Sequence, residues 1–140
     1  MEFYFDKNIK RFVGSEVRTW RGIKTSRIVS FIGDYHLEFR NRLIGLMQKR
    51  KKFISGYFDM EPFEVLRDMI REDQFNAIGG APQLLKVYEH MNRIPIAVKW
   101  AINQEQLTTL LGRPLQTHEI SNYPTIDPDT LIIEKGSSFG

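Results

Sequence analysis

The apolar residues of this chain change their spacing once, and that change constrains the fold more than any other feature of the sequence. Between residues 28 and 47 they recur at steps of three and four, and they do so again from Phe63 to Ile70. From Ile94 to Trp100 they alternate with other residues at steps of two. The first spacing is typical of one face of an α-helix and the second of a half-buried strand. The chain is therefore predicted to combine helices with strands.

Two amphipathic helices are predicted, at about residues 33–52 and 62–74. Gly33 offers an alternative start to the first, with Asp34 as its N-cap and a strand at residues 28–32 before it. Pro62 suits the first turn of the second helix, with Asp59 or Glu61 near its cap. The apolar stripe of the first helix consists of Ile28, Ile32, Tyr35, Phe39, Leu43, Leu46 and Met47.

The remaining segments predict an antiparallel sheet. Strands are predicted at residues 2–6, 11–14 and 16–20, with a turn at Gly14-Ser15, in a hairpin over residues 82–100, and at residues 130–134. Residues 107–111 are compatible with a strand or a short helix, and residues 122–129 with a loop. Because the helices are grouped in the middle of the chain, we expect an α+β fold: a single domain over residues 1–140, with two amphipathic helices packed on an antiparallel sheet.

The sequence Gly79-Gly80-Ala81-Pro82 is the sharpest break in the chain. A glycine-rich loop binds phosphate when it follows a strand and opens a helix, but here the predicted helix comes first. We therefore interpret the glycine pair as the stop of the second helix, with Pro82 preventing its return. If one glycine is not required by the turn, close approach of a neighbouring backbone is the alternative reason for its presence.

Several chemistries are excluded or disfavoured. The chain has no cysteine, which excludes disulfides, thiolate metal sites and thiol nucleophiles, and it has no Gly-x-Ser-x-Gly motif. His36, His90 and His118 do not have the spacing of a metal site, although each has a nearby glutamate, namely Glu38, Glu89 and Glu119. No metal and no cofactor is predicted. An enzyme with a site assembled from these dispersed groups remains an alternative.

The N-terminal segment, the lengths of the apolar runs and the absence of cysteine indicate where in the cell the protein is expected. The first six residues, Met-Glu-Phe-Tyr-Phe-Asp, do not resemble a secretory signal, and no apolar run reaches the roughly 18 residues of a membrane helix. Absence of cysteine favours a reducing compartment. A cytoplasmic protein is the expectation.

The charges are unevenly distributed, although the net charge is only +3. Between Lys7 and Lys52 there are thirteen lysines and arginines but only three acidic residues. Basic residues interleaved with aromatics such as Phe12 and Trp20 are used by proteins that bind single strands. The leading hypothesis is a non-catalytic binding or assembly module whose basic N-terminal half contacts nucleic acid or an acidic protein surface. The candidate contacts are Arg11, Arg18, Arg21, Lys24, Arg27, Arg40, Arg42, Lys49, Arg50, Lys51 and Lys52.

Two alternatives accompany this hypothesis. A solvated helix end that aids solubility would also account for the basic run at residues 49–52. A homo-oligomeric structural or adaptor protein would associate through exposed aromatics such as Trp20, Phe58 and Trp100.

Overall fold

The chain falls into two compact units, residues 1–61 and 62–140. The computed structural model describes residues 33–136 apart from 53–58, 88–92, 103 and 121, together with the backbone of four short strands before residue 33. Helices and a mixed sheet are both present, so the predicted α+β class is confirmed. The assignment of one domain to residues 1–140 stays a prediction.

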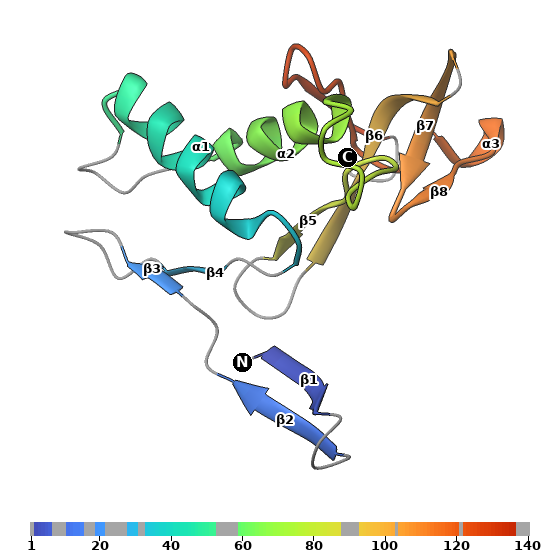
Figure 1. Ribbon diagram of the computed structural model, residues 1–140. Helices are drawn as coiled ribbons and strands as arrows, with labels where there is room; N and C mark the ends of the chain where they lie inside the picture. Colours follow the sequence, from blue (N-terminus) through green and yellow to red (C-terminus); the bar gives the residue numbers. More distant parts are fainter. Residues whose placement is uncertain are drawn as a thin grey trace. The chain divides into compact units, whose positions relative to one another are not determined.

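The four strands before residue 33 form two antiparallel pairs (Figure 1). The first two predicted strands are confirmed, and their register places Arg11 opposite Asp6. Gly14 and Ser15 continue the second strand, so the turn predicted there is wrong. Part of the strand predicted at 16–20 lies outside the described residues. The strands are β1 (Glu2–Asp6), β2 (Arg11–Ser15), β3 (Thr19–Arg21) and β4 (Ile28–Ser30).

Helix α1 (His36–Lys49) follows a turn in which Gly33 and Tyr35 have left-handed backbone angles, φ 107° and 58°. Tyr35 occupies the N-cap position, and no side chain caps the helix. The prediction of Asp34 as the N-cap is therefore wrong, because the turn continues one residue beyond it. Since residues 28–30 form β4, the alternative of a strand before Gly33 is confirmed.

The buried face of α1 follows the predicted spacing. Leu43 and Met47 are 3% and 1% exposed, and Phe39 and Leu46 are half-buried. Gly45 lies on the exposed side, where a built Cβ atom would meet nothing within 4 Å. This glycine lowers helix propensity by about 1 kcal/mol relative to alanine without a packing reason.

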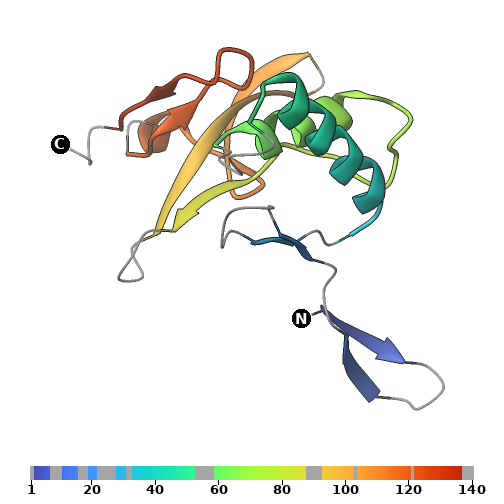
Figure 2. The same ribbon diagram turned by 90° about the vertical axis from the view of Figure 1, so that its left-hand side faces the viewer.

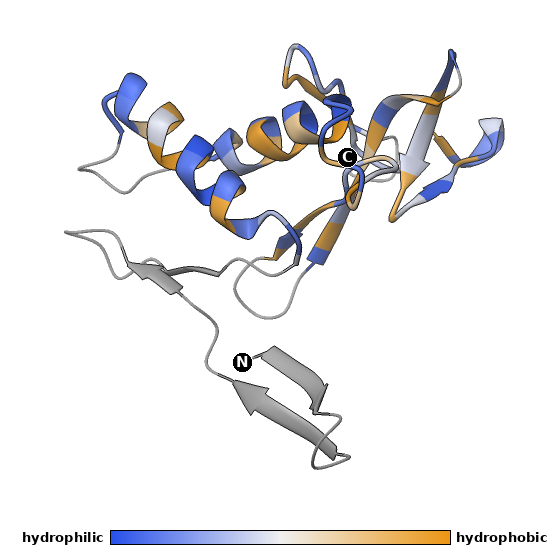
Figure 3. Ribbon diagram, viewed as in Figure 1, coloured by the Kyte–Doolittle hydropathy of each residue, from blue (hydrophilic) through white to orange (hydrophobic). Residues whose placement is uncertain are grey.

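Helix α2 (Glu61–Arg71) begins with the last residue of the first unit. Pro62 is its second residue, where the missing N–H costs no helical hydrogen bond. Phe63, Val65 and Met69 are buried, and apolar residues recur along the helix in Figure 3. The predicted second helix is confirmed, although it ends three residues earlier than expected.

Successive turns, not the glycine pair, end α2. The N–H of Glu72 donates to the carbonyl oxygen of Met69 at 3.2 Å, and the N–H of Phe75 to that of Glu72 at 3.2 Å. The interpretation of the glycine pair as the helix stop is therefore wrong, because both glycines lie in the following loop. Gly80 has φ 75°, whereas Gly79 does not have a positive φ, and a Cβ atom on either would meet nothing within 4 Å. Of the two, only Gly80 has a backbone angle that favours glycine. Close approach of a neighbouring backbone explains neither Gly79 nor Gly80.

The sheet of the second unit is built around one long strand, β6. β5 and β7 pair with it in antiparallel fashion, and β5 runs beside it in Figures 1 and 2. β9 pairs with it in parallel, so the sheet is mixed and mostly antiparallel, whereas an antiparallel sheet was predicted. The strands are β5 (Leu84–Val87), β6 (Arg93–Ile102), β7 (Glu105–Leu110), β8 (Arg113–Pro114), β9 (Thr125–Ile126) and β10 (Ile133–Glu134), in the order β10-β9-β6-β7-β8 with β5 also on β6.

The middle of β6 is buried on both faces. Ile96, Val98 and Trp100 are at most 7% exposed, as the alternation predicted, but Ala97 between them is 0% exposed. Ala97 forms a core cluster with two buried leucines, and Tyr123 packs against it. Trp100 is therefore not the exposed aromatic that the oligomer alternative assumed. Helix α3 (Thr117–Ile120) adds Ile120 to the same cluster, whose leucines are Leu110 and Leu115.

The C-terminal segment agrees with the sequence only in part. Residues 105–110 form β7, so the strand alternative for residues 107–111 is confirmed. Residues 125–126 form β9 inside the predicted loop, and the predicted strand at 130–134 is reduced to its last two residues, β10. Strands of two residues show no readable alternation of apolar and polar side chains, which explains both differences.

Candidate functional site

The basic run at the end of α1 does not continue as helix. Arg50 is the C-cap and Lys51 has a left-handed φ of 56°. The N–H of Lys51 donates to the carbonyl oxygen of Gln48 at 3.0 Å, and the N–H of Lys52 to that of Met47 at 2.9 Å. This pair of bonds is the Schellman motif, here with lysine where glycine is usual. Because of this reversal, the four neighbouring cations do not follow the regular spacing of one helix.

Two of these cations converge on one buried carboxylate. Glu61 has a side chain only 2% exposed, and its Oε1 accepts hydrogen bonds from Lys52 Nζ at 2.6 Å and Arg50 Nη1 at 3.3 Å. Its Oε2 accepts the backbone N–H of Asp59 at 2.7 Å. We call Arg50, Lys52 and Glu61 the Glu61 cluster. All three residues belong to the first unit.

The Glu61 cluster holds its carboxylate in the charged form. Burial by itself favours the neutral acid, but hydrogen bonds from Lys52, the N–H of Asp59 and Arg50 outweigh it and lower the pKa of Glu61 to about 2. Sequence reasoning assigned Glu61 to the helix cap and missed this role. Nothing in the local spacing signals it, because the partners lie nine and eleven residues away in the sequence.

The other cations of α1 differ in their partners. Arg42 Nε donates to Glu38 Oε1 at 2.7 Å, one turn earlier on the helix. Arg40, Lys49 and Lys51 are exposed, and none has an ion pair with any residue that the structure describes. We call Arg40, Lys49 and Lys51 the exposed cations.

Five candidate contacts lie earlier in the chain. Arg11 and Arg21 belong to β2 and β3, of which the structure describes the backbone. Arg18, Lys24 and Arg27 lie outside the described residues. The structure thus brings together Arg50 and Lys52 and leaves the assembly of the five N-terminal cations as a prediction.

Few contacts support the alternative of an enzyme whose site is assembled from the histidines and nearby glutamates. His36 starts α1, with its Nδ1 3.2 Å from the carbonyl oxygen of Gly33. His118 is exposed on α3, in the other unit, and His90 lies outside the described residues. Within the described part of the chain, no group of three histidine or acidic side chains is placed to hold a metal ion.

The second unit pairs most of its cations with carboxylates. Arg71 donates to both oxygens of Asp129, at 2.6 and 3.3 Å, and lies 5.0 Å above the ring of Trp100. Arg113 likewise contacts both oxygens of Glu119, at 3.0 and 2.7 Å. Two further pairs are Arg67 with Asp68 and Lys99 with Glu134.

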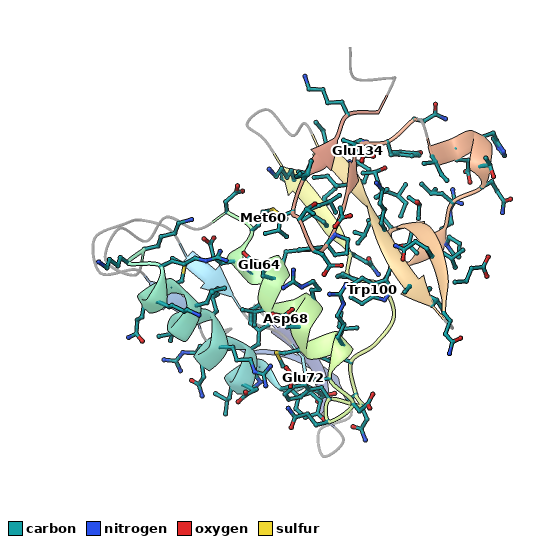
Figure 4. The ribbon with its side chains drawn as sticks, turned by 90° about the horizontal axis from the view of Figure 1, so that it is seen from above. Met60, Glu64, Asp68, Glu72, Trp100 and Glu134 are labelled. Atoms are coloured by element: carbon teal, nitrogen blue, oxygen red, sulfur yellow. The ribbon has the colours of Figure 1, made fainter. Side chains whose placement is uncertain are left out.

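Helix α2 is also the more acidic helix. Glu64 and Asp68 of this helix and Glu72, the residue just after its end, recur every four residues, and Figure 4 shows them in a row. Spacing by four places side chains on one helical face. Glu64 is buried, so it is the exposed Asp68, the half-buried Glu72 and the paired cations that make the second unit a poor surface for a polyanion.

Comparison with known proteins adds no relative: the chain has no significant match to a family model, a curated protein or a solved structure. Within the described residues, no helix has the length and apolar character needed to cross a membrane.

Proposed function

We propose that this protein is a non-catalytic binding module whose basic N-terminal half, residues 7–52, contacts an anionic macromolecule. Thirteen basic against three acidic residues in that segment supply the attraction. The single observation that carries the proposal is the placement of the exposed cations. Arg40, Lys49 and Lys51 are open to solvent without an ion pair to any described residue.

Single-stranded nucleic acid fits these cations better than an acidic protein surface does. Arg40 and Lys49 are nine residues apart in one helix, so they lie about two and a half turns apart, on opposite sides. A flexible phosphate chain can follow cations around a helix, whereas a rigid acidic surface contacts one side. The aromatics Phe12 and Trp20 among the N-terminal arginines add the residue type on which bases stack.

The proposal is tested by titrating a dye-labelled oligothymidylate with the protein at low salt and following fluorescence anisotropy. The double variant Lys49→Gln/Lys51→Gln is expected to bind up to about 25-fold more weakly at 0.1 M salt, because each phosphate contact to a single strand releases about 0.7 counterions. Gln removes the charge of each lysine while keeping a polar side chain.

The matched control is the double variant Arg93→Gln/Lys135→Gln, which removes the same charge from exposed residues of the second unit. It is expected to bind like the unaltered protein. Equal losses in the two double variants would contradict the proposal. Displacement of the oligonucleotide by polyglutamate of equal length at equal concentration would favour the acidic protein surface instead.

A homo-oligomeric protein is the second candidate, favoured by one feature of β5. Leu85 and Val87 are 47% and 68% exposed, and their spacing by two places them on the same face of that strand. Among the described strands β5 pairs with β6 alone. Exposed apolar edge strands are sites of strand-to-strand association. A monomeric mass by light scattering at high concentration would exclude this candidate.

A further inference from the structure

We propose that Glu61 is an internal competitor for the anionic partner: its carboxylate occupies Arg50 and Lys52, so that these two cations contribute little to binding until they are released. This inference rests on the proposed function and concerns the regulation of the same basic segment. It divides the run at residues 49–52 into two partner-binding cations, Lys49 and Lys51, and two engaged cations, Arg50 and Lys52.

The contacts of the Glu61 cluster carry the inference. Lys52 Nζ lies 2.6 Å from Glu61 Oε1 and Arg50 Nη1 lies 3.3 Å from the same oxygen, so both cations already have an anionic partner. The side chain of Glu61 is 2% exposed, whereas those of Arg50 and Lys52 are 38% and 44% exposed, so water reaches the pairs from the side of the cations only. A phosphate in solution offers Arg50 and Lys52 no comparable desolvated contact.

The two cations nevertheless remain within reach of a partner. The side chain of Arg50 is 38% exposed and that of Lys52 is 44% exposed, whereas the carboxylate between them is covered. An incoming phosphate can therefore approach the outer side of each cation while Glu61 holds the inner side. Removing the charge of Glu61 takes away the anionic contact that it makes with each of the two cations, so that both can interact more strongly with the partner.

The test compares Glu61→Gln with the unaltered protein in the oligothymidylate titration. If both cations are released, binding is expected to tighten by up to about 25-fold at 0.1 M salt, and the slope of log K against log salt to steepen by up to about 1.4. Asp34→Asn is the matched control, since it also removes one negative charge but Asp34 is exposed and has no ion pair to a described residue. Equal gains from Glu61→Gln and Asp34→Asn would overturn the inference.

A second variant tests the inference without disturbing Glu61. Arg50→Gln leaves Glu61 bonded to Lys52 and to the N–H of Asp59. It is expected to change the affinity less than twofold, whereas Lys49→Gln is expected to lower it by up to about fivefold at 0.1 M salt. Equal losses in these two variants would also overturn the inference.

The two proposals fail in different ways. If neither the unaltered protein nor Glu61→Gln binds the oligonucleotide, the proposed function is wrong and the inference falls with it. If the unaltered protein binds with salt dependence and Glu61→Gln binds no more tightly while remaining folded by circular dichroism, only the inference is wrong.

Discussion

Replacing Glu61 with Gln is expected to destabilise the protein by about 3 kcal/mol at neutral pH, and the loss is expected to shrink in acid. The pKa of Glu61 falls from 4.5 to about 2 on folding because Lys52 and Arg50 hold the carboxylate, although burial opposes the charge. One pKa unit corresponds to about 1.4 kcal/mol of differential interaction, which leads to the figure of about 3 kcal/mol. Gln retains the shape of the side chain and an oxygen that accepts hydrogen bonds, but it lacks the negative charge that attracts the two cations.

The sign of the pH dependence follows from the direction of the shift. Because the pKa of Glu61 is lower in the folded than in the unfolded protein, its contribution is fully present above pH 4.5 and is lost as the pH falls through 2. At pH 3 we expect less than half of this contribution to remain. Glu61→Gln and the unaltered protein should therefore become similar in stability as the solution is acidified.

The assay is urea unfolding followed by circular dichroism at pH 7, 5, 4 and 3, with the difference in unfolding free energy taken at each pH. The control is Glu38→Gln, which removes one carboxylate from a pair whose glutamate side chain is 44% exposed. Surface pairs of this kind contribute about 0.3–0.5 kcal/mol. A difference for Glu61→Gln that stays constant from pH 7 to pH 3, or falls below about 1 kcal/mol at pH 7, would refute the reasoning.

Two glycine predictions are tested by thermal or urea unfolding. Gly80→Ala is expected to cost about 1 kcal/mol because φ at Gly80 is 75°, whereas Gly79→Ala is expected to be neutral. Equal effects would show that the loop does not depend on that backbone angle. Gly136→Ala is expected to destabilise the second unit by about 1–3 kcal/mol, because its Cβ atom would lie 2.7–2.9 Å from the backbone of Tyr123. If the midpoint of unfolding does not change in this variant, Gly136 and Tyr123 lie further apart than described.

Long, strongly periodic segments could be predicted from the sequence. The stripe ending at Met47 and the alternation from Ile94 to Trp100 each repeat several times, so α1 and β6 were expected near their observed positions. Rules based on residue type failed to predict the helix cap where the chain turns before α1. Asp34 is a good capping residue by type, yet the helix begins two residues later, after a left-handed Tyr35.

The candidate site was predictable only in its charge. The basic run at residues 49–52 is plain in the sequence, but its division into engaged and exposed cations depends on a chain reversal at Lys51. Glu61 lies just beyond the basic segment, and its pairing with Lys52 requires the chain to return. Pairings between residues distant in sequence leave no periodic signal, so composition predicted the sign of the surface and not its partners.

The slope of log K against log salt for the oligothymidylate complex tests the central claim most directly. If the exposed cations contact phosphates, the slope is expected to be about −2, since three contacts release about 0.7 counterions each, and N-terminal contacts would make it steeper. The variant Lys49→Gln/Lys51→Gln should reduce the magnitude of that slope by about 1.4. A slope near zero, or one that this variant leaves unchanged, would contradict the account.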